Sequence, residues 1–248
     1  MVYHFLKQGQ DRELNSVQTN KTDGWEETVK NVVTYMVLAI VSTLCLAKLE
    51  ESHAATIDLP EPCLKSDVSI EETLAKRRSI REFADEKLSM EAIGQLLWAA
   101  QGITEPERGY RTAPSAGATY PLEIYVVTPD GFYQYVPQGH KVRQLGTEDL
   151  RPRLARAAGG QKTVGEAGAV FVITAVYERT AAKYRTHATR YVHLEAGHVA
   201  QNILLQAVAL DLGSVPIGGG SSKRVVEALS LPSDHEPVYI IPVGKKKK

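Results

Sequence analysis

The sequence places three guanidinium groups and one hydroxyl within five residues, at Arg77, Arg78, Ser79 and Arg81. Arginine side chains bind phosphate oxygens through two parallel hydrogen bonds, and a serine hydroxyl adds a further donor. The cluster is therefore a candidate site for a phosphate group. Taken alone, it is also typical of a solvated helix end, where cations complement the helix dipole.

Two further segments are rich in small residues. One comprises Pro114, Ser115, Ala116 and Gly117, where small side chains let the backbone approach a planar ligand. The other comprises Pro216, Ile217, Gly218 and Gly219, where backbone N–H groups can bond a ring nitrogen or an anion. This second segment is not a P-loop, because the following Ser-Ser-Lys lacks the required Gly-Lys-Ser/Thr order. Each segment alone is also compatible with a plain surface loop.

The surrounding pattern predicts an α+β fold, in which strands are clustered and helices flank a sheet. A capping box at Ser69 and Glu72 starts one helix, and Ser89 starts another that ends near Gly102. The longest helical pattern runs from residue 191 to 212, with Gly213 expected as its C′ residue. Short helices are expected at 150–158 and 225–229, strands at 122–128, 132–136, 169–177 and 238–243, and a loop at 104–121.

Composition excludes several classes of protein. Lys and Arg total 29 and Asp and Glu total 29, so no global field would attract nucleic acid or an anionic membrane. The terminal run 245–248 is interpreted as a solvated tail. The two cysteines, Cys45 and Cys63, form no CxxC pair, which argues against a structural zinc or iron–sulfur site. His193, Glu195 and His198 lack the second helix of a carboxylate metal site, so no metal is predicted and helix packing is preferred.

The first 55 residues form a predicted leader, followed by one domain over residues 56–248. Residues 32–47 are a continuous run of apolar and small residues, short for a bilayer span but close to a signal-peptide core. Small residues at Ser52 and Ala54 resemble a cleavage pattern. Export or membrane tethering is preferred over a cytoplasmic location, and membrane contact is expected only through an uncleaved leader. The alternative is a buried helix or a poorly ordered extension of a cytoplasmic enzyme.

The order and spacing of the three segments resemble the FMN-binding skeleton of the nitroreductase superfamily. The stretches LLWAAQGI, RTAPSAGATYPLEIYVV, KYRTHATRYVHLEAGHVAQNILLQA and PVYIIPVG resemble its SagB-type branch, which includes flavin dehydrogenases of thiazolines and oxazolines in peptides. The resemblance covers roughly residues 57–244. It implies the nitroreductase fold, with a central, mostly antiparallel sheet flanked by helices. It also implies an intertwined homodimer with two FMN sites at its interface.

The resemblance assigns roles to individual residues. It implies that the cluster of Arg77, Arg78, Ser79 and Arg81 holds the phosphate and ribityl chain of FMN. The segment 114–117 would lie against the isoalloxazine of the partner subunit, and a backbone N–H of the segment 216–219 would face flavin N5. Lys183 and Tyr184 fall where azoline dehydrogenases carry a catalytic Lys–Tyr pair. Such a pair could remove a proton from a substrate carbon while hydride moves to N5. The alternative is a solvated lysine beside a packing tyrosine.

Three departures from the superfamily pattern leave the substrate open. Arg185 stands where a glycine commonly follows the Lys–Tyr pair, and Gly220-Ser221-Ser222 replaces a loop that often contains phenylalanine. The chain also stops soon after its last predicted strand, so Lys245 or a neighbour would have to supply a basic residue to the phosphate.

Three functions follow from these features. The leading hypothesis is an FMN-dependent oxidoreductase, a dehydrogenase or reductase of a small heterocyclic or peptidic substrate. The second is an NAD(P)H-dependent reductase of nitroaromatics or quinones. The third is a non-catalytic subunit that binds flavin or peptide.

Overall fold

The computed structural model describes residues 30–38 and 55–247. The chain divides into two units, Met1–Ala54 and Ala55–Lys248. In the first unit, residues 30–38 form a helix in which the Thr34 hydroxyl donates to the Lys30 carbonyl at 2.8 Å. Within the described residues, no helix has the length and apolar character needed to cross a membrane. The rest of the predicted apolar run, 39–47, and the pattern at 52–54 lie outside the described residues.

The second unit is built on a seven-stranded sheet with the order β1-β6-β5-β4-β7-β9-β8. Every neighbouring pair of strands in this sheet is antiparallel. A separate antiparallel pair joins β2 and β3. The strands are β1 (Thr56–Asp58), β2 (Ile103–Glu105), β3 (Tyr110–Arg111), β4 (Leu122–Thr128), β5 (Gly131–Val136), β6 (Lys141–Gly146), β7 (Ala169–Ala175), β8 (Leu212–Ser214) and β9 (Glu236–Lys245).

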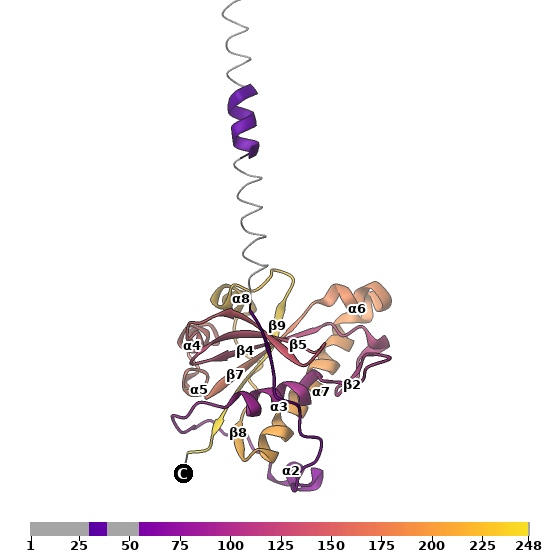
Figure 1. The fold of residues 1–248 in the computed structure, drawn as a ribbon, viewed down its shortest axis with the longest axis vertical. Coiled ribbons are helices and arrows are strands. Elements are labelled where there is room, and N and C mark those ends of the chain that lie inside the picture. Colours follow the sequence, from indigo (N-terminus) through magenta and orange to yellow (C-terminus); the bar gives the residue numbers. More distant parts are fainter. Residues whose placement is uncertain (1–29, 39–54, 248) are drawn as a thin grey trace, which may run out of the picture. The chain divides into compact units, whose positions relative to one another are not determined.

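Helices flank this sheet on both faces (Figure 1). Alternation along β4 divides the core, because successive strand residues point to opposite faces. Ile124 and Val126 pack in the core that α3 and α7 cover, whereas Tyr125 and Val127 pack in the core that α4, α5 and α8 cover. The helices are α2 (Ile70–Lys76), α3 (Met90–Gln101), α4 (Arg151–Ala157), α5 (Lys162–Glu166), α6 (Tyr177–Tyr184), α7 (Ala188–Ala209) and α8 (Ser222–Leu229).

The predicted α+β architecture, with an antiparallel sheet flanked by helices, is confirmed. The apolar run that forms β7 is buried along its whole length, as expected of a central strand. Both predicted serine caps are present. Ser69 accepts from the N–H of Glu72 at 3.1 Å, and Ser89 accepts from the N–H of Ala92 at 3.3 Å. The Glu72 carboxylate pairs with Lys76 one turn further on.

Three expectations about the elements were wrong or incomplete. Gly213 does not close the long helix, because α7 ends at Ala209 and Asp211 takes the positive φ of 55° instead. Gly213 lies in β8, where an added Cβ would lie 2.7 Å from Ile80 Cγ2. The pattern also missed β2, β3, β6, β8, α5 and α6, of which β3 lies within the predicted loop 104–121, and the predicted strand over 169–177 ends at Ala175.

Candidate active site

The basic segment lies beside the strand that leads into the second glycine-containing segment. Ser79 forms a parallel bridge with Ser214, and the N–H of Ile80 donates to the Ser214 carbonyl at 3.0 Å. Pro216 follows two residues later. The structure therefore brings together two segments that are far apart in the sequence.

The three guanidinium groups of the basic segment have no acidic partner among the residues that the structure describes. Among residues 55–247, none of Arg77, Arg78 and Arg81 forms a salt bridge. Arg78 donates to the backbone carbonyls of Ala75 and Arg77 at 3.0 and 2.7 Å. Arg78 and Arg81 are exposed, and Arg77 is half-buried. The segment therefore presents uncompensated positive charge that can bind an anion.

The second glycine-containing segment runs from buried backbone to open surface. Ile217 pairs with Ile240 through hydrogen bonds of 2.8 and 2.9 Å. Gly218 and Gly219 are exposed. A Cβ added to Gly218 would contact only Tyr239, at 3.6 Å, and a Cβ added to Gly219 would have no neighbour within 4 Å. The lack of side chains keeps this backbone accessible to a flat ligand.

The first small-residue segment is strongly curved and meets α6. Gly117 has a φ of +59°, and Ala118 and Tyr120 also have positive φ values, of 54° and 43°. Lys183 Nζ lies 3.5 Å from the Gly117 carbonyl oxygen. A Cβ on Gly117 would lie 2.6 Å from both Lys183 Nζ and Tyr184 Oη. The structure therefore places the predicted Lys–Tyr pair directly over this segment.

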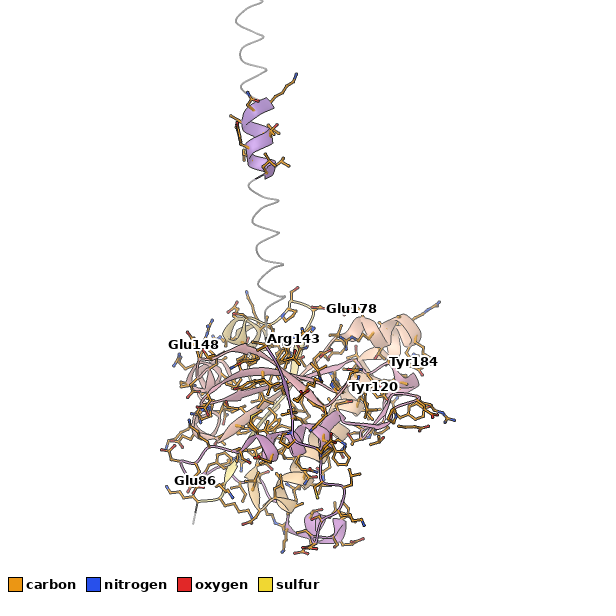
Figure 2. The ribbon with its side chains drawn as sticks, viewed as in Figure 1. Glu86, Tyr120, Arg143, Glu148, Glu178 and Tyr184 are labelled. Atoms are coloured by element: carbon orange, nitrogen blue, oxygen red, sulfur yellow. The ribbon has the colours of Figure 1, made fainter. Side chains whose placement is uncertain are left out.

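Further contacts hold α6 against the segment that follows Gly117. The hydroxyls of Thr119 and Thr180 are 2.9 Å apart, and Arg179 Nη1 donates to the Tyr120 carbonyl at 3.2 Å. The ring of Tyr184 meets the ring of Tyr191 edge-on, with centroids 4.9 Å apart. In Figure 2, Tyr120 and Tyr184 are both labelled on the side of the domain that carries α6. These contacts fix where α6 presents its side chains.

A buried polar network that sequence reasoning did not assign to the site supports the same segment. The Tyr120 N–H donates to Ser115 Oγ at 2.9 Å, and the Arg111 N–H donates to Tyr120 Oη at 3.2 Å. Arg111 Nη1 donates to Gln101 Oε1, and Gln101 Nε2 donates to Glu195 Oε1, both at 3.2 Å. The buried network thus links α3 and α7 to the loop.

Glu195 is the buried end of this network, with 3% of its surface exposed. Burial raises its pKa, although hydrogen bonds from Ser115 and Gln101 and the charge of Arg111 oppose the shift. The sequence had pointed to Glu195 only as a rejected metal ligand. His193, which was considered with Glu195 as a metal ligand, instead forms a 2.9 Å hydrogen bond with the hydroxyl of Tyr177.

The candidate residues form two groups within the chain. One contains the basic segment and residues 216–219, and the other contains residues 114–117 with Lys183 and Tyr184. Among residues 55–247, no hydrogen bond or salt bridge joins the two groups. Lys245 lies on the first side, because its carbonyl accepts from the N–H of Ala84, while Lys246 pairs with Asp211 at 2.6 Å.

Sequence comparisons give relatives for most of the domain. A model of the Nitroreductase family matches residues 74–245. A Methanocaldococcus jannaschii protein named as a nitroreductase is 40% identical over 197 residues, which is 77% of this chain and 98% of that protein. The microcin B17-processing protein McbC of Escherichia coli is 26% identical over 156 residues, covering 58% of this chain and 57% of McbC.

Solved structures of nitroreductases and of a related oxidoreductase have a similar fold. A nitroreductase structure from Ralstonia eutropha has a TM-score of 0.72 and 32% identity, covering 78% of this chain and 90% of that one. The NADPH:FMN oxidoreductase of Vibrio harveyi, complexed with NAD⁺, has a TM-score of 0.55 and 26% identity. That match covers 72% of this chain and 69% of the Vibrio protein.

Proposed function

The chain belongs to the nitroreductase family, and from this premise we propose that it is an FMN-dependent oxidoreductase. The observation that carries the proposal is the convergence of Lys183 Nζ and Tyr184 Oη on Gly117. A proton-transferring pair is thereby held over the segment that, by resemblance, lies against the flavin. The match to an NADPH:FMN oxidoreductase supports the choice of cofactor.

The residues of the first group fit the phosphate end of FMN. Arg77, Arg78 and Arg81 offer guanidinium groups without acidic partners among the described residues, and Ser79 adds a hydroxyl. These side chains would hold the phosphate and ribityl chain. The exposed backbone at Gly218 and Gly219 would face the ring, with its N–H groups available to N5. When bound, FMN supplies a site at N5 that accepts or donates hydride.

The residues of the second group would handle the proton and the face of the ring. Pro114, Ser115, Ala116 and Gly117 would pack against the isoalloxazine. Lys183 and Tyr184 would exchange a proton with the substrate carbon or heteroatom next to the carbon that gives up or receives hydride. Both side chains reach the same point, so one can act on the substrate while the other positions it.

We propose that the functional unit is a homodimer, in which each ligand site combines the first group of one chain with the second group of its partner. Two exposed apolar side chains support this, since Ile70 and Leu74 on α2 are 56% and 54% exposed. Ile70 lines a hollow of about 720 Å³, together with most of the residues from 60 to 68 and parts of α3 and α7. Exposed apolar surface of this kind marks protein interfaces. Light scattering after gel filtration tests this, and a monomer with bound FMN would contradict it.

For the substrate we propose a thiazoline or oxazoline ring in a peptide. The SagB-type stretches and the match to the microcin B17-processing protein support this class. In this reaction the ring loses hydride and a proton and becomes aromatic. A defined azoline peptide should be oxidised by the FMN-loaded parent protein, and mass spectrometry would detect the loss of two mass units. No product from any azoline peptide would count against this substrate class while leaving FMN binding testable.

A second candidate is an NAD(P)H-dependent reductase of nitroaromatics or quinones. The names of the Methanocaldococcus, Ralstonia and Vibrio proteins favour it. Anaerobic stopped-flow mixing with NADPH or NADH separates the two. Rapid bleaching of the flavin band supports the reductase, and an unchanged band supports a dehydrogenase with another electron acceptor.

A further inference from the structure

A second, polar cavity of about 290 Å³ opens where strands β4 and β5 part. The ladder between these strands begins at Tyr125 opposite Gln134, although β4 itself begins at Leu122 and β5 extends to Val136. The cavity is lined by residues of both strands beyond the start of this ladder. Its volume lies at the small end of the range for ligand pockets, so it suits a compact group rather than a whole cofactor.

The lining of this cavity is positively charged. It contains Arg111, Arg143 and Arg179 but a single carboxylate, Glu123. That carboxylate is already engaged. Its Oε1 pairs with Arg179 Nη2 at 2.6 Å, and its Oε2 accepts from Gln134 at 3.0 Å. Two of the three arginines therefore lack a neutralising partner in the lining.

The hydrogen-bonding capacity of these two arginines is also unfilled. Among residues 55–247, Arg143 forms neither a salt bridge nor a side-chain hydrogen bond. Arg111 Nε is buried and lacks a partner within the described residues, while its Nη1 bonds Gln101. Desolvation by burial lowers the pKa of Arg111, although the charges of Tyr120, Glu123 and Glu195 oppose the shift. A buried charged donor without a partner is costly, and an anion in the cavity would satisfy it.

We infer that this cavity binds an oxyanion, the carboxylate or phosphate group of a small ligand, between Arg111 and Arg143. Guanidinium groups match the paired oxygens of both anions. Arg143 is labelled in Figure 2 on the sheet, apart from Tyr184. Arg143 belongs to β6, whereas the cluster of Arg77, Arg78 and Arg81 lies beside Ser214 of β8, toward the opposite edge of the sheet, so the cavity and the cluster are different places.

The cavity shares residues with the network beneath the loop at 114–117. The Arg111 guanidinium lies over the ring of Tyr120, at 4.3 Å from its centroid, and the Tyr120 N–H donates to Ser115. Gln101 lines the cavity and also bonds Glu195. An anion bound to Arg111 would therefore contact the same hydrogen-bonded network that supports the loop at 114–117. The inference concerns binding alone and stands whether or not the chain carries out flavin chemistry.

Isothermal titration calorimetry at constant ionic strength tests this site with two probes, sodium phosphate and sodium glutarate. Because the basic segment also attracts phosphate, the titrations use a protein carrying Arg78→Gln and Arg81→Gln. We expect saturable binding of at least one probe, and the probe that binds tells carboxylate from phosphate. Adding Arg143→Gln should weaken that binding at least tenfold. Adding Arg156→Gln, which changes an exposed arginine on α4 outside the cavity, should leave it unchanged.

Two results would overturn the inference. One is the absence of saturable binding of either probe in the Arg78→Gln, Arg81→Gln protein. The other is equal affinity in the proteins with and without Arg143→Gln, provided that circular dichroism shows both to be folded. Arg143 is exposed and lacks partners among the described residues, so its replacement leaves the fold intact.

Discussion

Lys183 places its ammonium nitrogen 3.5 Å from the carbonyl oxygen of Gly117, a residue 66 positions earlier in the chain. The approach depends on glycine, because a Cβ at position 117 would lie 2.6 Å from that nitrogen. It also depends on α6, which is held to the loop by Thr180 and Arg179. Substitutions at Gly117 and on α6 therefore test whether this contact positions Lys183.

Replacing Gly117 by alanine should displace the Lys183 and Tyr184 side chains and lower turnover. The φ of +59° adds a stability cost of about 1 kcal/mol for any residue with a Cβ. Gly109→Ala is a matched control, because Gly109 has a φ of +68° but open space around its missing side chain. Chemical denaturation should show a similar loss of stability in both variants. Turnover should fall in Gly117→Ala alone, and equal turnover in the two variants would contradict the positioning role.

Removing the proton-transferring groups should slow the reaction without releasing the cofactor. We expect Lys183→Met and Tyr184→Phe each to lower kcat by about 10²-fold or more, the usual contribution of general acid–base catalysis. Lys162→Met, which removes an exposed lysine on α5, should change kcat little. Steady-state kinetics and the flavin content of each variant provide the measurement. Wild-type kcat in a protein that carries both Lys183→Met and Tyr184→Phe would remove the pair from the mechanism.

Arg185 adopts a backbone conformation that favours glycine. Its φ of 48° and ψ of −119° match the first central position of a type II′ turn. Glycine has no Cβ and adopts this conformation without strain, so Arg185→Gly should raise the free energy of unfolding by about 1 kcal/mol. Arg185→Ala keeps the strain and removes the charge, and it should give no such gain. Urea denaturation of the three proteins measures this, and a gain in the alanine variant would assign the effect to charge.

Glu195 should make stability depend on pH. Its pKa in the folded protein lies above the ordinary value of 4.5, so the folded state binds more protons than the unfolded state at mildly acidic pH. The stability of the parent protein should therefore decline as pH rises from 4.5 through the folded pKa. Glu195→Gln lacks this titration, so it should gain stability relative to the parent over that window. Thermal melts from pH 4 to pH 8 would show the gap, and parallel curves would contradict this origin.

Much of the sheet could be predicted from the sequence because its strands are apolar runs with clear ends. The predicted strand over 122–128 coincides with β4, and Ser69 and Ser89 cap the helices where expected. The helix α6 was missed because its residues are mostly polar and its position is set by tertiary contacts such as Thr119 with Thr180. The segment is eight residues long, which is too short for apolar periodicity to identify a helix.

The candidate site divides in the same way. The short motifs could be predicted from the sequence because each is a single segment of consecutive small or basic residues. The network joining Gln101 to Glu195 spans 94 positions and leaves no local pattern. The prediction that Gly213 ends α7 was wrong, because Asp211 takes the left-handed conformation that glycine usually adopts after a helix. Gly213 instead lies in β8, where its missing side chain allows close packing against Ile80.

A fluorescence titration of the purified protein with FMN and with riboflavin, which lacks the phosphate, tests whether the chain binds flavin through its basic segment. We expect uptake of one FMN per chain, with riboflavin bound at least tenfold more weakly, because charge-assisted bonds to the phosphate are lost. In the variant carrying Arg78→Gln and Arg81→Gln, the difference between the two ligands should largely disappear. Absence of FMN uptake, or equal affinity for FMN and riboflavin in the parent protein, would show that the basic segment does not hold the phosphate of FMN.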